Sequence, residues 1–275
     1  MIHLPVPPVA SKKSASDRST SGNSVSSLRS GKSAPASSGP SNLWENIKAV
    51  LVTVAFFLVM RTFLIEAYRI PSGSMIPTLL VGDWLFVNKL AYGPHVPFTS
   101  INLPGYDEPE RGDVVVFVSP DQVDQPEDPN PTLVKRLVAV AGDTVWMRGG
   151  LFYVNGMPQR QGFGANENPK GDGGFSHPLF QWQKPFEVRG TSAGDPPAQP
   201  TLDDWGPLVV PAGKLFMLGD NRYDSKDGRY WGFVPRENVR GRPVFVYYSY
   251  RADESDRPLP FITDIRWGRI GTIIR

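Results

Sequence analysis

An uncharged, largely apolar segment, Ala49–Met60, most restricts how this protein of 275 residues can fold. As a helix it is about 18 Å long, shorter than the roughly 30 Å core of a bilayer. The usable stretch extends to Ile47–Ile65 if Lys48 and Arg61 reach the two interfaces with their charged ends. We therefore predict one transmembrane helix over residues 43–67. A buried or interfacial helix is the alternative, and a cleaved signal peptide is disfavoured because no Ala-x-Ala pattern follows.

The residues before this segment have a different composition. Residues 1–42 are rich in Ser, Gly, Pro and Lys and contain almost no large apolar residue after Val9, which predicts a disordered tail. Positive charges on this side of the segment outnumber negative ones: Lys12, Lys13, Arg18, Arg29, Lys32 and Lys48 against Asp17 and Glu45. The positive-inside rule then keeps the tail in the cytoplasm and places the chain after about Tyr68 on the far side of the membrane.

The pattern beyond Tyr68 is that of β structure. Apolar or alternating runs separated by Gly, Pro and Asp predict strands at 84–89, 113–119, 132–141, 144–148, 208–211, 214–218 and 244–250, and a hairpin that turns at Asn155-Gly156. Residues 159–207 have an irregular composition, and no long amphipathic helix follows the membrane segment. We predict a mainly antiparallel β fold, with a catalytic core formed by residues 68–150 and 208–275 and a smaller inserted cap at 151–207.

Composition excludes several kinds of site. The chain has no cysteine, so it can form no disulfide, thiolate metal site or cysteine nucleophile. A net charge of only +2 gives no basis for bulk electrostatic binding to nucleic acid. None of the three histidines lies in an acid-rich neighbourhood, which disfavours a histidine triad or a zinc site.

A stiff loop follows the membrane segment directly. Ser72 and Ser74 stand one glycine apart, with Pro71 before them and Pro77 after them. Glycine permits turns that other residues resist, and the prolines prevent a helix from continuing. A hydroxyl held on such a loop suits a nucleophile or an oxyanion donor. An isolated Ser-Gly-Ser is more often a surface turn, so its position beside the membrane helix is what favours a functional interpretation.

Lys135 lies within an apolar strand. Alternation places it on one face with Leu133, Leu137 and Ala139, and places Arg136 on the other with Val134, Val138 and Val140. Because both faces are apolar, we expect both cations to be buried. A buried lysine can lose its proton, and lowering its pKa from about 10.4 to about 7.5 takes roughly 4 kcal/mol. The neutral amine could then accept a proton from a serine. The alternative is an edge strand from which both cations reach water.

Five segments in a fixed order resemble the bacterial type I signal peptidases. They are PSGSMIPTL (71–79), GDWLFVNKLAYG (82–93), RGDVVVF (111–117), Val134–Arg136 followed by Gly142-Asp143, and GDNRYDSKDGRYWGFVP (219–235). The resemblance covers about 68–149 and 208–242. It implies a serine endopeptidase with a Ser/Lys dyad, anchored in the plasma (inner) membrane, that removes signal peptides from exported preproteins on the outer face without a metal or organic cofactor.

The resemblance also implies roles for individual residues. Ser74 matches the nucleophile and Lys135 the general base, while Ser72 would donate to the oxyanion and Ser225 would orient the lysine amine. Asp227 and Arg229 match a structural ion pair, and Asp220 with Arg136 is a candidate for a second. The shallow apolar pockets for small substrate residues, one and three positions before the cut, would be lined by Tyr68, Ile70, Pro71, Met75, Leu79 and Val134.

Two other functions remain open from the sequence. One is a Ser/Lys peptidase dedicated to a single substrate, such as a conjugation or pilus protein. The other is a non-catalytic, membrane-tethered β module that binds exported chains. The sequence does not predict the oligomeric state.

Overall fold

The structure is a computed structural model, and it describes all residues except 1–40, 97–98, 100, 161–170, 172–173 and 254–256. The chain divides into two units, Met1–Ile47 and Lys48–Arg275. Of the first unit only residues 41–47 are described, and they are helical. The tail predicted to be disordered, residues 1–42, thus lies almost entirely outside the described residues.

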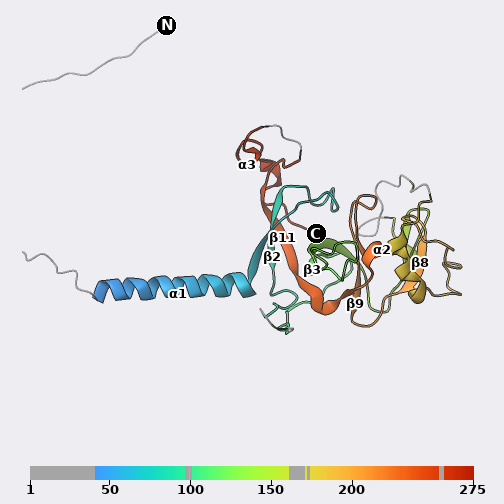
Figure 1. The fold of residues 1–275 in the computed structure, drawn as a ribbon, viewed down its shortest axis with the longest axis horizontal. Coiled ribbons are helices and arrows are strands. Elements are labelled where there is room, and N and C mark those ends of the chain that lie inside the picture. The colour runs from blue at the N-terminus through green and yellow to red at the C-terminus, as the bar shows by residue number, and fades with distance from the viewer. Residues whose placement is uncertain (1–40, 97–98, 100, 161–170, 172–173, 254–256) are drawn as a thin grey trace, which may run out of the picture. The chain divides into compact units, whose positions relative to one another are not determined.

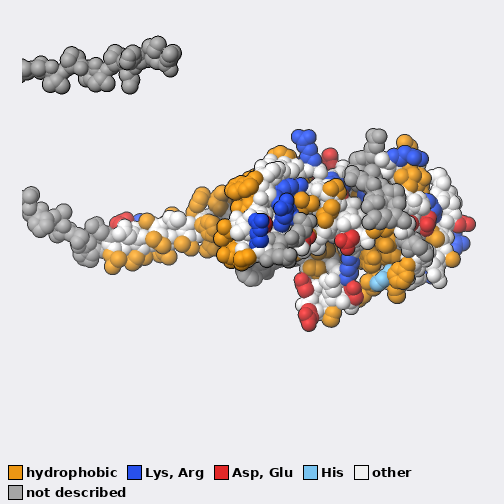
Figure 2. Space-filling model, turned by 90° about the horizontal axis from the view of Figure 1, so that it is seen from above, with side chains coloured by type: hydrophobic (Ala, Val, Ile, Leu, Met, Phe, Trp, Pro, Cys, Tyr) orange, Lys and Arg blue, Asp and Glu red, His pale blue; other side chains and the backbone are white. Residues whose placement is uncertain are grey.

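Helix α1 (Ser41–Phe63) carries the predicted membrane segment. Its stretch Leu43–Phe63 is long and apolar enough to cross a bilayer, and none of it is buried within the protein. Hydrophobic side chains are numerous on the face of this helix that Figure 2 shows. The helix ends at Phe63 rather than near residue 67, because Ile65–Arg69 forms strand β1 and pairs with β2.

In the part of the chain that the structure describes, the main sheet has seven strands, and the pairings between them are antiparallel, as expected. Its long strand β11 lies beside β2 (Figure 1). Their order is β1, β2 (Asp83–Asn88), β11 (Val239–Ser249), β3 (Val114–Val118), β4 (Thr132–Val140), β9 (Lys214–Leu218) and β10 (Val234–Pro235). Strand β11 begins five residues before the predicted 244, and β1 and β10 were not predicted. The sheet places β1 at one edge, immediately after the membrane helix.

A second sheet contains four strands in the order β7 (Met157–Pro158), β6 (Leu151–Val154), β5 (Thr144–Arg148) and β8 (Trp205–Val209). The predicted hairpin is confirmed, with φ of 51° at Asn155 and 84° at Gly156. The cap differs from the predicted 151–207, because its sheet includes β5 before it and the end of β8 after it. The 3-10 helix η2 (Pro178–Phe186) lies in the same insertion.

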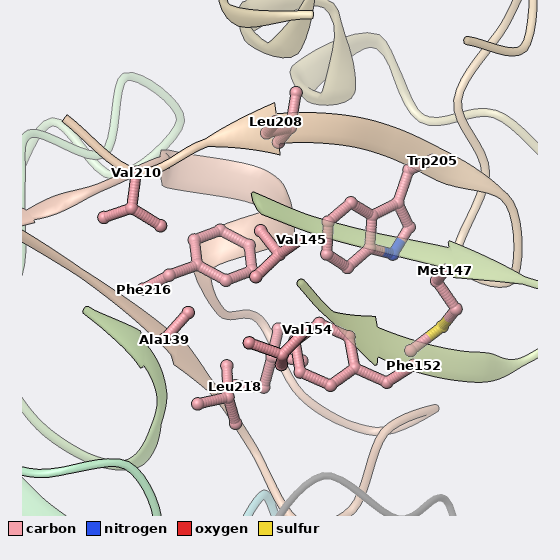
Figure 3. Close-up of a cluster of buried hydrophobic side chains, with 11 residues drawn as sticks. Ala139, Val145, Met147, Phe152, Val154, Trp205, Leu208, Val210, Phe216 and Leu218 are labelled. Carbon is pink, nitrogen blue, oxygen red and sulfur yellow. The ribbon is translucent and has the colours of Figure 1, made fainter. Parts of the chain in front are cut away.

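The two sheets share a hydrophobic core (Figure 3). Strands β4 and β9 of the main sheet contribute Ala139, Phe216 and Leu218, which meet Trp205 and Phe152 of the small sheet. The remaining short elements are α2 (Gly228–Trp231), η3 (Arg236–Asn238), α3 (Pro260–Thr263) and η4 (Trp267–Arg269). In the part of the chain that the structure describes, no long helix follows α1, as expected.

Strand β4 departs from the predicted alternation in its second half. A register shift between Leu137 and Ala139 interrupts its pairing with β9. Val138 and Ala139 consequently pack into the same core cluster, whereas the prediction put them on opposite faces. A β-bulge adds a residue to one strand and so reverses the faces beyond it. The alternation around Lys135 and Arg136 lies before the bulge, and its pairing with β3 is regular.

Candidate active site

The two serines lie on the loop that joins β1 to β2. Hydrogen bonds from Ile70 N to Asp83 O, 2.8 Å, and from Gly82 N to Ile70 O, 2.9 Å, close the base of this loop. Its apolar side chains Met75 and Leu79 are buried in the core cluster beneath it. This anchoring brings Ser72 Oγ within 3.5 Å of Ser74 Oγ. The loop is non-helical, as its prolines predicted.

Lys135 reaches this loop from the middle of the sheet. It lies on β4 opposite Val115 of β3, and only 4% of its surface is exposed. Its Nζ lies 2.5 Å from Ser74 Oγ. Burial lowers the pKa of the Lys135 amine to about 8, an effect that the charge of Asp227 partly opposes. A large fraction of this amine is therefore neutral at mildly alkaline pH, next to a hydroxyl that it can deprotonate.

Residues 219–229 hold the serine loop from its other side. Asn221 donates through Nδ2 to Gly73 O and through its backbone N to Ser74 O, both at 3.1 Å. Asn221 was not predicted to have a role, although it lies in one of the five segments that resemble the signal peptidases. Its contact with Gly73 spans 148 residues, so neither spacing nor periodicity could have revealed it.

Ser225 lies in the same place but does not make the predicted bond to Lys135. It is buried, and its hydroxyl has no hydrogen-bond partner among the described residues. It packs against Gly219, where a Cβ would collide with Ser225 Oγ and with Ser74 O. Glycine at 219 thus allows Ser225 and the serine loop to approach one another closely. The unpartnered hydroxyl is available to a rotated lysine amine or to a bound substrate.

Asp227 and Arg229 form a fully buried ion pair beneath the site. Their oxygen and nitrogen atoms lie 2.8 Å apart in two parallel contacts. Burial alone would raise the pKa of Asp227, but the charge of Arg229, together with the hydrogen bonds from Arg229 and Gly219 and the charge of Lys135, outweighs it, and the net effect is a lowered pKa. Asp227 also accepts from Gly219 N at 3.0 Å. The pair therefore fixes the segment that carries Ser225.

Asp220 and Arg136 form the second pair. Arg136 donates through Nε and Nη2 to the two oxygens of Asp220, at 2.7 and 2.6 Å. Thr78 of the serine loop donates to the same carboxylate at 2.6 Å. Arg136 also donates to Gly112 O at 2.6 Å. These contacts explain how an arginine is accommodated in a strand that is apolar on both faces.

A small groove, with a volume of about 120 Å³, runs past the two hydroxyls and the amine. It is lined by five of the six predicted pocket residues, namely Tyr68, Ile70, Pro71, Met75 and Val134, and also by Arg69, Thr132 and Leu133, which were not predicted. Leu79 does not line it, because its side chain is fully buried in the core under the loop.

Two free strand edges flank this groove. Strand β9 pairs with β4 only from Arg136 to Val140, so within the described residues no strand pairs with 132–135 on that side. Strand β1 lies at the edge of the sheet, and among the described strands it pairs with β2 alone. An extended peptide could therefore bind here by adding a strand.

Neither histidine of the described residues lines this groove. His95 pairs with Asn102, and His177 caps η2. Across the described ranges, no three His, Asp or Glu side chains gather into a group that could hold a metal ion.

The chain is similar to known proteins over most of its length. The family described as "Signal peptidase, peptidase S26" matches residues 43–248. A Signal peptidase I of Pseudomonas fluorescens is 36% identical over 76% of this chain and 73% of its own length. A Signal peptidase I of Leptolyngbya laminosa is 34% identical over 78% of this chain and 85% of its own length. One of Pseudomonas aeruginosa is 32% identical over 84% of this chain and 79% of its own length.

Proposed function

Because this chain belongs to the signal peptidase family, peptidase S26, it is a membrane-anchored serine endopeptidase that cleaves signal peptides, and we propose that Ser74 is its nucleophile and Lys135 its general base. The observation that carries this assignment is the 2.5 Å contact between Lys135 Nζ and Ser74 Oγ. A buried amine with a lowered pKa is the kind of base that can activate a serine without a histidine.

The reaction proceeds through an acyl-enzyme in this proposal. Neutral Lys135 takes the proton of Ser74 as its Oγ attacks the scissile carbonyl. The Ser72 hydroxyl and the Ser74 backbone N–H donate to the oxyanion. Lys135 then gives the proton to the leaving amine, and the acyl ester remains on Ser74. In the second half, Lys135 takes a proton from the water that attacks the ester, and returns it to Ser74 Oγ as the ester bond breaks and the signal peptide leaves. Once the amine has turned away from Ser74, Ser225, whose hydroxyl has no partner among the described residues, orients it for the later transfers. The reaction calls for no metal or organic cofactor.

The groove is suited to small side chains at positions −1 and −3 of the precursor. Its volume of about 120 Å³ is small, and Ile70, Met75 and Val134 make its wall apolar. The precursor binds as an extended strand between the free edges of β1 and of residues 132–135, so backbone hydrogen bonds supply affinity independently of most of its sequence. Such a mode supports action on many precursors rather than on one dedicated substrate.

The orientation follows from the charges around α1. Cations outnumber anions before it, so the N-terminus is cytoplasmic and the sheets lie on the outer side of the plasma (inner) membrane. Enzyme and precursor are then both held in the bilayer, which raises their effective concentration without further contacts. The bilayer is a partner of the chain in this proposal, and nucleic acid is not.

Cleavage of one precursor with an Ala-x-Ala site tests this function. The full-length protein should cut it at that site, and Ser74→Ala should lower the rate by at least about a thousandfold, because the attacking oxygen is removed. Ser176→Ala is a matched control: this hydroxyl donates to Pro200 O in the cap, and its loss should leave the rate unchanged. Cleavage that persists in Ser74→Ala would contradict the assignment, and a panel of unrelated precursors separates a general enzyme from a dedicated one.

A further inference from the structure

The joint between the membrane helix and the sheet is very short. Helix α1 ends at Phe63 and β1 begins at Ile65, so a single residue separates them. The last carbonyls of a helix have no partner within it and must find one elsewhere. Lys89, the residue that follows β2, is such a partner. The Nζ of Lys89 donates to Thr62 O at 3.1 Å and to Arg61 O at 3.4 Å.

Further contacts join the same lysine to the connecting residue and to β1. Its backbone N donates to Leu64 O at 3.0 Å. Its Nζ forms an ion pair with Glu66 of β1 at 2.7 Å. The Lys89 side chain is only 16% exposed, so solvent screens these contacts less than it would on an open surface. A cation at the C-terminus of a helix also complements the helix dipole. One side chain therefore connects the end of α1, the start of β1 and the end of β2.

We propose that Lys89 is a positioning residue that fixes the end of the membrane helix at a set distance from Ser74, and so determines how far beyond the bilayer a precursor is cut. This inference rests on the proposed function. Strand β1 lies in the chain between the end of α1 and the loop that carries Ser74, and its five residues span about 17 Å.

A precursor held in the bilayer must span the same distance from the membrane to Ser74 as the enzyme's own chain does. Its apolar segment ends at the same face of the bilayer as α1, and its chain must then reach Ser74, as β1 does. An extended precursor running beside β1 therefore needs about as many residues between its apolar segment and its scissile bond. Without the contacts of Lys89, the distance between the end of α1 and the serine loop could vary. The number of residues that a precursor needs before its scissile bond would then be less strictly set.

The test compares the full-length protein with Lys89→Met in detergent-free vesicles. The substrates are precursors with zero, three or six polar residues added before the cleavage site, and a short soluble peptide with the same site. For the unextended precursor, we expect Lys89→Met to lower kcat/KM about tenfold, as loss of a charge-assisted hydrogen bond would. Its dependence on the added length should flatten, and its kcat/KM for the soluble peptide should stay at the wild-type value. Lys89→Arg should restore the length dependence.

One control variant and one substitute variant complete the test. Arg236→Met breaks another surface ion pair, with Glu108, and should change none of these rates. If Lys89→Met does not fold, Glu66→Gln removes the negative partner of the ion pair and should flatten the length dependence in part. Glu66 also hydrogen-bonds Tyr68 of the groove, and glutamine can keep that contact. Equal losses on peptide and precursor, or an unchanged length dependence, would overturn the inference. Failure of the proposed function would look different, since the wild-type protein would then cut no substrate or Ser74→Ala would still cut.

Discussion

At the scale of single residues, the feature that matters most is a solvent-excluded amine against a serine hydroxyl. Moving an ammonium out of water costs free energy, and Lys135 avoids part of this cost by giving up its proton more easily. Asp227 and Asp220 attract the charged form, but burial is the larger effect, and the pKa falls from 10.5 to about 8. An arginine could not respond in this way, because it stays protonated throughout the accessible pH range.

The pH dependence of cleavage follows from this pKa. The active form is the neutral amine, so kcat/KM should rise with pH and level off above about 8. Below that value it should fall about tenfold for each pH unit. A pH–rate profile on a soluble peptide measures this. Lys135→Arg keeps the charge and the approximate length but supplies no neutral base, so cleavage should be lost at every pH. A profile that is flat between pH 6 and 9 would contradict the role of Lys135.

Some features of single residues in the site could be predicted from the sequence, and others could not. The types of residue and the segments that carry them could be recognised, and the apolar faces of β4 correctly predicted that Lys135 and Arg136 are buried. Contacts between distant segments could not be derived, so Asn221 was missed. Leu79 was wrongly placed in the pocket, because an apolar residue on a loop can as easily anchor that loop in the core as line a groove.

At the scale of secondary-structure elements, the serine loop is held by a network rather than by its own rigidity. Arg136 of β4, Asp220 of the segment after β9 and Thr78 of the loop form one hydrogen-bonded cluster. In addition, Arg269 of η4 donates to Thr78 O at 3.0 Å. Three parts of the chain that are far apart in sequence thus converge on the loop, which keeps the nucleophile at a constant distance from its base.

Breaking this cluster from one side should be costly. Asp220→Asn leaves the guanidinium of Arg136 almost buried without a countercharge, which should lower the free energy of unfolding by about 3–5 kcal/mol. Replacing both partners, as Arg136→Met with Asp220→Leu, should cost less than Asp220→Asn alone, because no buried charge is then left unpaired. Urea unfolding of the three proteins in detergent measures the difference. Similar losses for the single and the double variant would contradict this explanation, because the cost would then come from losing the pair itself and not from an unpaired charge.

The predictability of the elements differs along the chain for physical reasons. Strands with continuous apolar runs, such as β4, β5 and β9, were predicted within a residue or two, because burial on both faces leaves a strong pattern. The first residues of strand β1, 65–67, were assigned to the membrane helix, because Ile65 and Ala67 extend the apolar segment and only the pairing with β2 makes them a strand. The bulge in β4 leaves no trace in the residue pattern, since it depends on the register with β9.

At the scale of the whole folded unit after residue 47, the cap and the catalytic sheet are not independent bodies. Phe216 of β9 is fully buried and packs against Trp205 of β8, with ring centroids 5.5 Å apart. It also approaches Phe233 at 5.7 Å, beyond α2. Apolar area in this core is removed from water only when both sheets are present, so each stabilises the other.

Phe216→Ala should therefore destabilise both sheets together. Removing a buried aromatic side chain leaves a cavity and typically costs about 3–5 kcal/mol. Because the cavity lies between the sheets, we expect hydrogen exchange to accelerate in β5 and β6 as much as in β4 and β9, and urea unfolding to remain a single transition. Val209→Ala is a suitable control, since Val209 also lies at the cap but is 36% exposed, and its loss should change stability little.

The coupling between the sheets matters for catalysis, because β4 and the segment after β9 carry residues of the active site. Strand β4 bears Lys135, and the segment after β9 bears Asp220, Asn221 and Ser225, so a loosened core would move the base and the supports of the nucleophile together. We expect Phe216→Ala to lower kcat for a soluble peptide more than it raises KM, because the geometry of the reacting groups suffers before the outer groove does. If instead the cap unfolded in a separate transition and kcat stayed unchanged, the cap would fold independently of the catalytic sheet. The two ion pairs alone would then position the reacting groups.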